Sequence, residues 1–290
     1  MVLDSKRKII VYIFIFVFFG GISFTYADQT KEIRIGFVPS MGEGDIEIYQ
    51  ELINHLSRET GINFKGVTTK DYAGIIQALS YGQIDFARLG PKSYVEAAEY
   101  AEIEALALEL NKKGEPGYYG ILIAKNGKGI TSFAQAKDTR FAFTEPDSTS
   151  GYLVPSVMLV KDLKVEPRKY FKSINFSGSH GDSILGVKNG TYDIASVATK
   201  LLDRMVEKGE VVHDDFVILE KSDLIPGPCF CARKALPLKL KTDFQNALIS
   251  FNQNKKALQK LQCGGYMKTN DKTYDIIREL NLMKKQLTRK

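Results

Sequence analysis

The chain has 290 residues, enough for two lobes of ordinary size rather than one small core. Hydrophobic residues make up 44% of it, charged residues 26% and aromatic residues 11%, a composition that excludes a disordered or fibrous chain. The 40 Lys and Arg residues against 34 Asp and Glu residues give a net charge of +6. This mild positive balance suits a small anionic ligand, and without a basic cluster it does not predict nucleic-acid binding.

Residues 1–27 have the pattern of a secretory signal peptide. A basic run at residues 6–8 precedes an apolar stretch at residues 9–19, and the small residue Ala27 is followed by polar residues. We expect cleavage after Ala27 and export to the periplasm; the alternative is a membrane anchor that is never cut. The apolar stretch is shorter than the ~20 residues that a spanning helix needs, which favours cleavage.

Strands and helices alternate after this segment, as in an α/β protein. Residues 33–38 are typical of a strand, residues 45–59 of an amphipathic helix and residues 64–68 of a second short strand. Residues 71–87 then predict a helix, a glycine turn and a strand that begins near Asp85.

The segment 71–87 recurs without a gap at residues 179–195. The matching pairs are Ile76 with Ile184, Leu79 with Val187, Gly82 with Gly190, Asp85 with Asp193 and Ala87 with Ala195. The match predicts two structurally similar lobes, and it aligns Tyr72 with His180, each at the start of its helix. Because helix N-termini present free N–H groups, we expect this pair to bind an anion between the lobes. The alternative is that Tyr72 packs in the core and His180 lies on the surface.

A third helix start carries three consecutive hydroxyl groups, on Ser148, Thr149 and Ser150. It follows a predicted strand at residues 141–144. Pro155 places the helix N-terminus near Ser150, because proline is tolerated only in the first turn of a helix. Hydroxyl donors beside free backbone N–H groups suit a tetrahedral oxyanion. An ordinary N-cap is the alternative, but it needs only one such side chain.

Three cysteines, Cys229, Cys231 and Cys263, lie in the last quarter of the chain. In an oxidising compartment one disulfide to Cys263 would leave one thiol over, and three buried thiols are the alternative. The only histidine near them in sequence is His213, which gives too weak a ligand set for zinc. We therefore expect no metal and no cofactor.

Six segments resemble the phosphonate-, phosphite- and phosphate-binding proteins of ABC importers, in the order expected of that periplasmic family. They are residues 71–73, 89–94, 116–119, 147–155, 177–180 and 224–227. The resemblance implies a two-lobed α/β fold of the type II periplasmic binding proteins, with two crossing strands between the lobes and a hinge motion that closes them. It implies a first lobe of residues 32–120 and 225–290 and a second lobe of residues 121–224.

The resemblance also implies a set of ligand-binding residues, with tyrosines from the first lobe or hinge and hydroxyl and imidazole groups from the second. They are Tyr72, Tyr118, Ser148, Thr149, Ser150 and His180. Two further candidates are Arg88, which stands where family members often carry an aromatic residue, and Asp193.

A missing carboxylate predicts the ligand preference. Relatives that accept an aminoalkylphosphonate would be expected to carry a carboxylate after Asp193 to pair with the ammonium group, and this chain has Lys200. Residues 226–231 contain no acidic residue either, which leaves Asp193 and Glu145 as the acidic groups that could reach the cleft. Because an unpaired buried cation is strongly disfavoured, we expect phosphite, phosphate or methylphosphonate to bind better than 2-aminoethylphosphonate.

The implied function is that of a non-catalytic binding protein that captures a phosphorus oxyanion and delivers it to an ABC permease. We expect a monomer with no nucleic-acid partner. One alternative is the ligand-sensing partner of a membrane receptor, which the same residues would fit. The other is a phosphoester hydrolase using Ser148 and His180. It is disfavoured because the hydroxyls lack a nucleophile-elbow pattern and only Asp182 is near enough in sequence to orient His180.

Overall fold

The computed structural model describes residues 32–42 and 45–287. The expected signal segment 1–27 and its cleavage site after Ala27 lie outside these residues. Within the described ranges, every helix is too short or too polar to cross a membrane.

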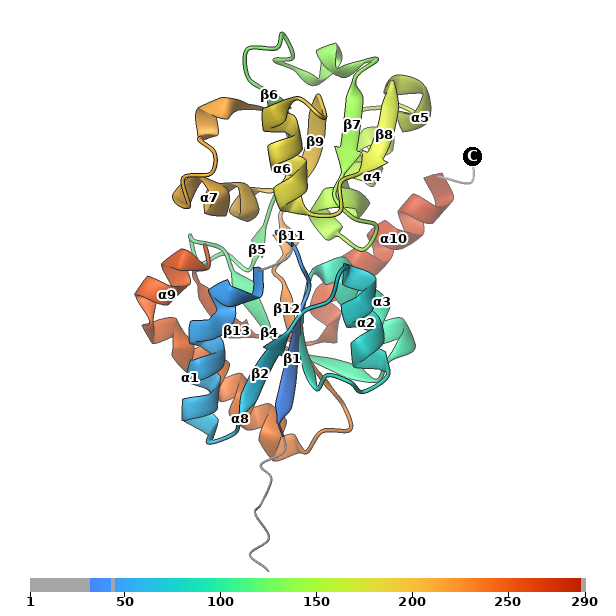
Figure 1. Cartoon of the computed structure of the whole chain (residues 1–290). Helices are drawn as coiled ribbons and strands as arrows, with labels where there is room; N and C mark the ends of the chain where they lie inside the picture. The colour runs from blue at the N-terminus through green and yellow to red at the C-terminus, as the bar shows by residue number, and fades with distance from the viewer. Residues whose placement is uncertain (1–31, 43–44, 288–290) are drawn as a thin grey trace, which may run out of the picture. The chain divides into compact units, whose positions relative to one another are not determined.

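The first sheet, in the described part of the chain, has six strands in the order β13-β4-β12-β3-β1-β2 (Figure 1). They are β1 (Ile33–Phe37), β2 (Phe64–Val67), β3 (Phe86–Leu89), β4 (Ile103–Leu110), β12 (Cys229–Arg233) and β13 (Gly265–Lys268). Strand β1 pairs in parallel with β2 and β3, whereas β12 is antiparallel to β3 and β4. We call this sheet with its helices the first lobe. Its helices are η1 (Asp45–Tyr49), α1 (Gln50–Thr60), α2 (Tyr72–Ser80), α3 (Pro91–Tyr100), α8 (Leu238–Ser250), η5 (Phe251–Gln253), α9 (Lys255–Lys260), η6 (Asp271–Tyr274) and α10 (Asp275–Leu287).

Apolar side chains hold these helices against the sheet. Alternate residues of β1 point to opposite faces, and Ile35 and Phe37 are buried with aliphatic side chains of α1 and with the ring of Phe244 on α8. Phe86 stacks on Phe244 of α8 with ring centroids 4.1 Å apart. The expected helix at residues 45–59 begins as a short 3₁₀ turn, and its α-helical part starts at Gln50.

The second sheet has the strand order β10-β6-β9-β7-β8 among the residues that the structure describes. Its strands are β6 (Gly120–Lys125), β7 (Arg140–Phe143), β8 (Ser173–Phe176), β9 (Ile194–Ala198) and β10 (Phe216–Lys221). We call this sheet with its helices the second lobe. Its helices are η2 (Phe133–Ala136), the π-helix η3 (Thr149–Leu153), α4 (Val154–Lys161), α5 (Pro167–Tyr170), α6 (His180–Asn189), α7 (Thr199–Glu207) and η4 (His213–Asp215).

Two short strands connect the lobes (Figure 1). Strand β5 (Gly117–Tyr118) leads from the first sheet to the second, and it pairs antiparallel with β11 (Ile225–Pro226), which leads back. The fold is therefore mixed α/β with two lobes joined by two crossing strands. The predicted domain boundaries, after residues 120 and 224, lie next to this strand pair; the boundaries themselves stay a prediction.

The sequence repeat has a counterpart in the sheets. Strands β2-β1-β3-β12 of the first lobe have the same order and relative directions as β8-β7-β9-β6 of the second. Helix α2 precedes β3 as α6 precedes β9. Both connecting turns place a glycine in the left-handed region, with φ of 70° at Gly82 and 79° at Gly190. Each lobe thus presents a helix start at the same position of its sheet.

The last helix, α10, contacts both lobes. It begins beside Tyr274, which is fully buried with its ring 4.7 Å from that of Tyr94 on α3. Along its length α10 packs against α3 of the first lobe and α4 of the second (Figure 1). The chain therefore joins the lobes through this helix packing as well as through β5 and β11.

Candidate ligand-binding site

A small cavity lies between the lobes and collects the predicted residues. Its volume is about 40 Å³. All six predicted ligand-binding residues line it: Tyr72, Tyr118, Ser148, Thr149, Ser150 and His180. Arg88 lines it as well, and so does Lys200. We call this space the interlobe cavity.

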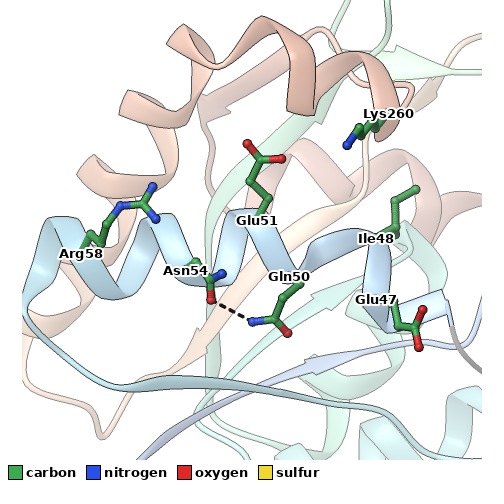
Figure 2. Close-up of a pocket in the computed structure, with 7 residues that line it drawn as sticks. All are labelled: Glu47, Ile48, Gln50, Glu51, Asn54, Arg58 and Lys260. Atoms are coloured by element: carbon green, nitrogen blue, oxygen red, sulfur yellow. Dashed lines mark hydrogen bonds between the residues drawn. The ribbon is translucent and has the colours of Figure 1, made fainter.

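A larger hollow of about 470 Å³ lies elsewhere, along α1 of the first lobe (Figure 2). Its lining is mostly polar, and it includes Gln50, whose side-chain amide donates to Asn54 at 2.8 Å. It contains none of the predicted residues and is open to solvent, so we place the candidate site in the interlobe cavity.

Three helix starts face the interlobe cavity, and side chains cap each of them. Helix α2 begins at Tyr72 with the Asp71 carboxylate accepting from an amide of the first turn, at 2.8 Å. Helix α6 begins at His180, and the Ser179 hydroxyl accepts from an amide at 3.0 Å. Ser148 caps η3 in the same way. Because the caps fix each first turn, the remaining free N–H groups and the first side chains are held toward the cavity.

The loop before η3 is built on a close backbone approach. The Ser148 hydroxyl accepts from the Gly151 amide at 3.0 Å, and the Gly151 carbonyl accepts from the Ser196 hydroxyl at 2.7 Å. A Cβ atom at Gly151 would overlap the side chain of Thr144, which is fully buried. Glycine is therefore required here. The helix begins at Thr149 as a π-turn, one residue before the expected start near Ser150.

His180 is a neutral hydrogen-bond donor. The Ala198 backbone amide donates to its Nδ1 at 3.2 Å, so Nδ1 is an acceptor and the proton of the neutral ring sits on Nε2. Nε2 lies 3.3 Å from the Ser148 hydroxyl oxygen at the cavity. Burial is the main cause that lowers the pKa of His180 to about 3, and the nearby positive charge of Lys200 contributes to this shift. The imidazole thus offers an N–H group without a charge.

The hydroxyl groups of the loop are oriented by contacts from the first lobe and hinge. Thr149 Oγ1 accepts from the backbone amide of Lys92 at 2.9 Å. The Tyr118 hydroxyl forms hydrogen bonds with Thr149 and Ser150, and burial raises its pKa. Around the cavity the lobes also touch directly: the Lys92 ammonium bonds to Asp147 at 2.9 Å, and the His180 amide donates to a carbonyl of the first lobe at 2.9 Å. The two lobes are closed on the cavity.

A buried ion-pair cluster forms one wall of the interlobe cavity. Arg88 Nε and Nη2 donate to one carboxylate oxygen of Glu109, at 2.9 and 2.7 Å. The Lys200 ammonium, from the second lobe, donates to the other oxygen of Glu109. All three residues are nearly fully buried, with exposed fractions of 4% for Arg88 and Glu109 and 8% for Lys200. Burial alone would raise the pKa of Glu109, but the two cations hold it down at about 2.

Glu109 is the functional candidate that sequence reasoning missed. It stands near the end of β4 and is the buried one of the two acidic residues in that strand; the other, Glu104, is half-buried and accepts from the Lys241 ammonium group. A carboxylate in such a position needs a cationic partner, and that signal was available in the sequence. The identity of the partners was not, because Arg88 and Lys200 are 21 and 91 residues away.

Asp193 is not brought to the interlobe cavity. Its carboxylate accepts from the amide, Nε and Nη2 of Arg140, at 2.8, 3.0 and 2.7 Å, at the end of β9 remote from Ala198. Asp85, its counterpart in the repeat, likewise accepts from the Arg34 amide on the neighbouring strand at 3.2 Å. Both aspartates therefore tie a strand to its neighbour, and we leave Asp193 out of the candidate site.

Glu145 lies in the loop before the hydroxyl groups. It is 7% exposed, and its carboxylate accepts from the Asp147 amide at 2.6 Å. Burial is the main cause that raises its pKa to about 7. The cysteines are buried free thiols: Cys229 and Cys231 lie on β12 and Cys263 lies beside β13.

Comparison with known proteins gives a consistent result. A family model described as "ABC transporter, phosphonate, periplasmic substrate-binding protein" matches residues 35–274. The chain is 25% identical over 265 residues to the phosphonates-binding periplasmic protein of Escherichia coli, covering 89% of this chain and 78% of that protein. It is 32% identical over 231 residues to the phosphate-import protein PhnD of Mycolicibacterium smegmatis, covering 74% of this chain and 71% of that protein.

Solved structures show the same fold. The binding protein component of an ABC phosphonate transporter from Pseudomonas aeruginosa superposes with a TM-score of 0.82 and 30% identity, covering 89% of this chain and 87% of that one. PhnD1 from Prochlorococcus marinus superposes with a TM-score of 0.77 and 17% identity, covering 87% and 97%.

Proposed function

Because this chain belongs to the family of periplasmic substrate-binding proteins of ABC phosphonate transporters, we propose that its interlobe cavity binds one small phosphorus oxyanion for delivery to a membrane permease. The observation that carries the proposal is the convergence of Tyr72, Tyr118, the hydroxyls of residues 148–150 and His180 on one buried cavity. Each can donate a hydrogen bond, and together they surround a space of about 40 Å³. Such a set matches the several acceptor oxygens of a tetrahedral anion.

The proposed ligands are phosphite, phosphate and methylphosphonate. The Mycolicibacterium relative is named for phosphate import, and the Prochlorococcus structure holds methylphosphonate. The cavity is small, and its charged lining residues among those described are the cations Arg88 and Lys200. A ligand with an ammonium tail would meet Lys200 instead of a carboxylate, so we rank 2-aminoethylphosphonate below the other three.

We propose that the protein is a monomeric carrier and not a hydrolase. Nucleophilic attack by Ser148 would need His180 as a base oriented by an acidic group. His180 instead accepts a backbone N–H at Nδ1, and its Nε2 carries the proton. The carboxylate of Asp182 accepts from the Ser179 hydroxyl at 2.7 Å, so it is engaged away from the imidazole. We assign residues 1–27 to export, with cleavage after Ala27.

Calorimetric titration of the exported chain with the four ligands tests the proposal. We expect tight one-to-one binding of at least one of phosphite, phosphate and methylphosphonate. The double variant Ser148→Ala, Ser150→Ala removes two hydrogen bonds to a charged ligand at about 1.5–3 kcal/mol each, so affinity should fall by about 10²-fold or more. Thr191→Ala, an exposed hydroxyl outside the cavity, is the matched control. Unchanged affinity in the double variant for every ligand would contradict the assignment of the cavity.

A further inference from the structure

Glu109 and Lys200 meet across the boundary between the lobes. Glu109 is the penultimate residue of β4 in the first sheet, whereas Lys200 is in the first turn of α7 in the second lobe. Their ion pair stands at the wall of the interlobe cavity, and Arg88 holds the other carboxylate oxygen. The pair can form only when the lobes are closed, because its two members come from different lobes.

The formal charges around the interlobe cavity do not balance. The hydroxyls and the phenols are neutral, and His180 is a neutral donor. Among the described residues that line the cavity, Arg88 and Lys200 carry positive charge. One carboxylate, that of Glu109, bonds to both cations. One positive charge is therefore left without a counterion in this group of residues.

We propose that Lys200 is a specificity-determining residue whose ammonium group supplies the positive charge that the bound oxyanion neutralises, while the single negative charge of Glu109 balances Arg88. The inference rests on the proposed function and names the residue through which the cavity would select ligands by their charge. An unbalanced cation in a closed cavity is costly, and an anion removes that cost. A ligand with an ammonium tail adds a second cation and restores the cost. Closure therefore favours ligands by their net negative charge.

Two single variants with opposite expected effects test this charge balance. Lys200→Met keeps the length of the side chain and leaves Arg88 balanced by Glu109, so phosphite and methylphosphonate should bind roughly tenfold or more weakly. The same variant should also reduce the difference between the affinities for methylphosphonate and 2-aminoethylphosphonate. Glu109→Gln leaves both cations without their counterion, so these anions should bind more tightly than they do to the wild type. If the two residues only packed the wall, both variants would weaken binding.

Controls separate the charge from folding and from the proposed function. Lys239→Met removes the same charge at a site that is 86% exposed, and affinity should not change. Should circular dichroism show Glu109→Gln to be unfolded, Lys200→Arg replaces it: this variant keeps the charge and should bind within about threefold of the wild type. Equal anion affinity in the wild type and Lys200→Met refutes the inference alone. A wild-type protein that binds none of the ligands refutes the proposed function and this inference together.

Discussion

Two buried groups, His180 at the interlobe cavity and Glu145 in the loop before Ser148, should make folding stability depend on pH in opposite directions. His180 has a pKa lowered from 6.5 to about 3 by burial, so between these values the unfolded chain binds a proton that the folded chain does not. The contribution of His180 to the free energy of unfolding is fully present above pH 6.5 and decreases as the pH falls toward 3. Each pH unit below 6.5 lowers the free energy of unfolding by up to about 1.4 kcal/mol, which gives about 2 kcal/mol between pH 6.5 and 4.5.

Glu145 makes folding stability change with pH in the opposite direction. Burial raises its pKa from 4.5 to about 7, so the folded chain holds a proton that the unfolded chain has lost. Its contribution is complete below pH 4.5 and is lost as the pH rises toward 7. The Glu145 side chain is not completely enclosed, so solvent screening reduces the effect, and we expect about 1 kcal/mol over the same interval. The wild-type protein should therefore become only slightly more stable from pH 4.5 to 6.5.

Urea denaturation between pH 4.5 and 6.5, in buffers free of phosphorus oxyanions, can separate the two groups. In Glu145→Gln the stability should rise with pH by about 2 kcal/mol, because His180 then has the largest difference in pKa between the folded and unfolded chains in this interval. In His180→Asn it should fall by about 1 kcal/mol, and the double variant should be nearly flat. If His180→Asn has the same pH profile as the wild type, the imidazole is not buried and neutral, and its assignment as an uncharged donor is wrong.

Three further outcomes are expected. Gly151→Ala should weaken oxyanion binding at least tenfold by calorimetry, because the added methyl group overlaps Thr144 and displaces the loop; unchanged affinity would show that the loop can shift freely. The thiols of Cys229, Cys231 and Cys263 should resist alkylation in the native protein, since burial raises the pKa of the Cys263 thiol to about 12 and that of Cys229 as well. Mass spectrometry should find all three labelled only after unfolding. Small-angle scattering should show a smaller radius with bound ligand, and identical profiles at saturation would count against hinge closure.

Local signals in the sequence predicted residues that the structure brings together at the interlobe cavity. Helix starts are marked by caps, glycine turns and proline, which act within a few residues. The repeat added the information that two of these starts are equivalent, and its alignment alone paired Tyr72 with His180, which both line the interlobe cavity. The same repeat also explains Asp193, since its match to Asp85 marks a structural role that is shared by both lobes.

Contacts between the lobes could not be predicted in this way. Lys200 bonds to Glu109 and Lys92 to Asp147 across the lobes, although Lys92 also bonds to Glu96 on its own helix. No local pattern specifies which charged side chains meet when two lobes close. The role of Arg88 shows the same limit. The sequence suggested that Arg88 lies at the pocket, and the structure adds that its guanidinium group donates to Glu109.

Helix α10 lies outside the interlobe cavity, yet it can influence the affinity for the ligand. It is rooted in the first lobe through Tyr274 and reaches α4 of the second, so any separation of the lobes must loosen it from one of them. The residues of α3 and α4 that α10 packs against do not line the cavity, and these contacts stabilise the closed form with or without ligand. The apparent dissociation constant depends on the fraction of molecules that are already competent to bind. Changes along α10 can therefore adjust the concentration range over which this carrier works while its choice of ligand stays the same.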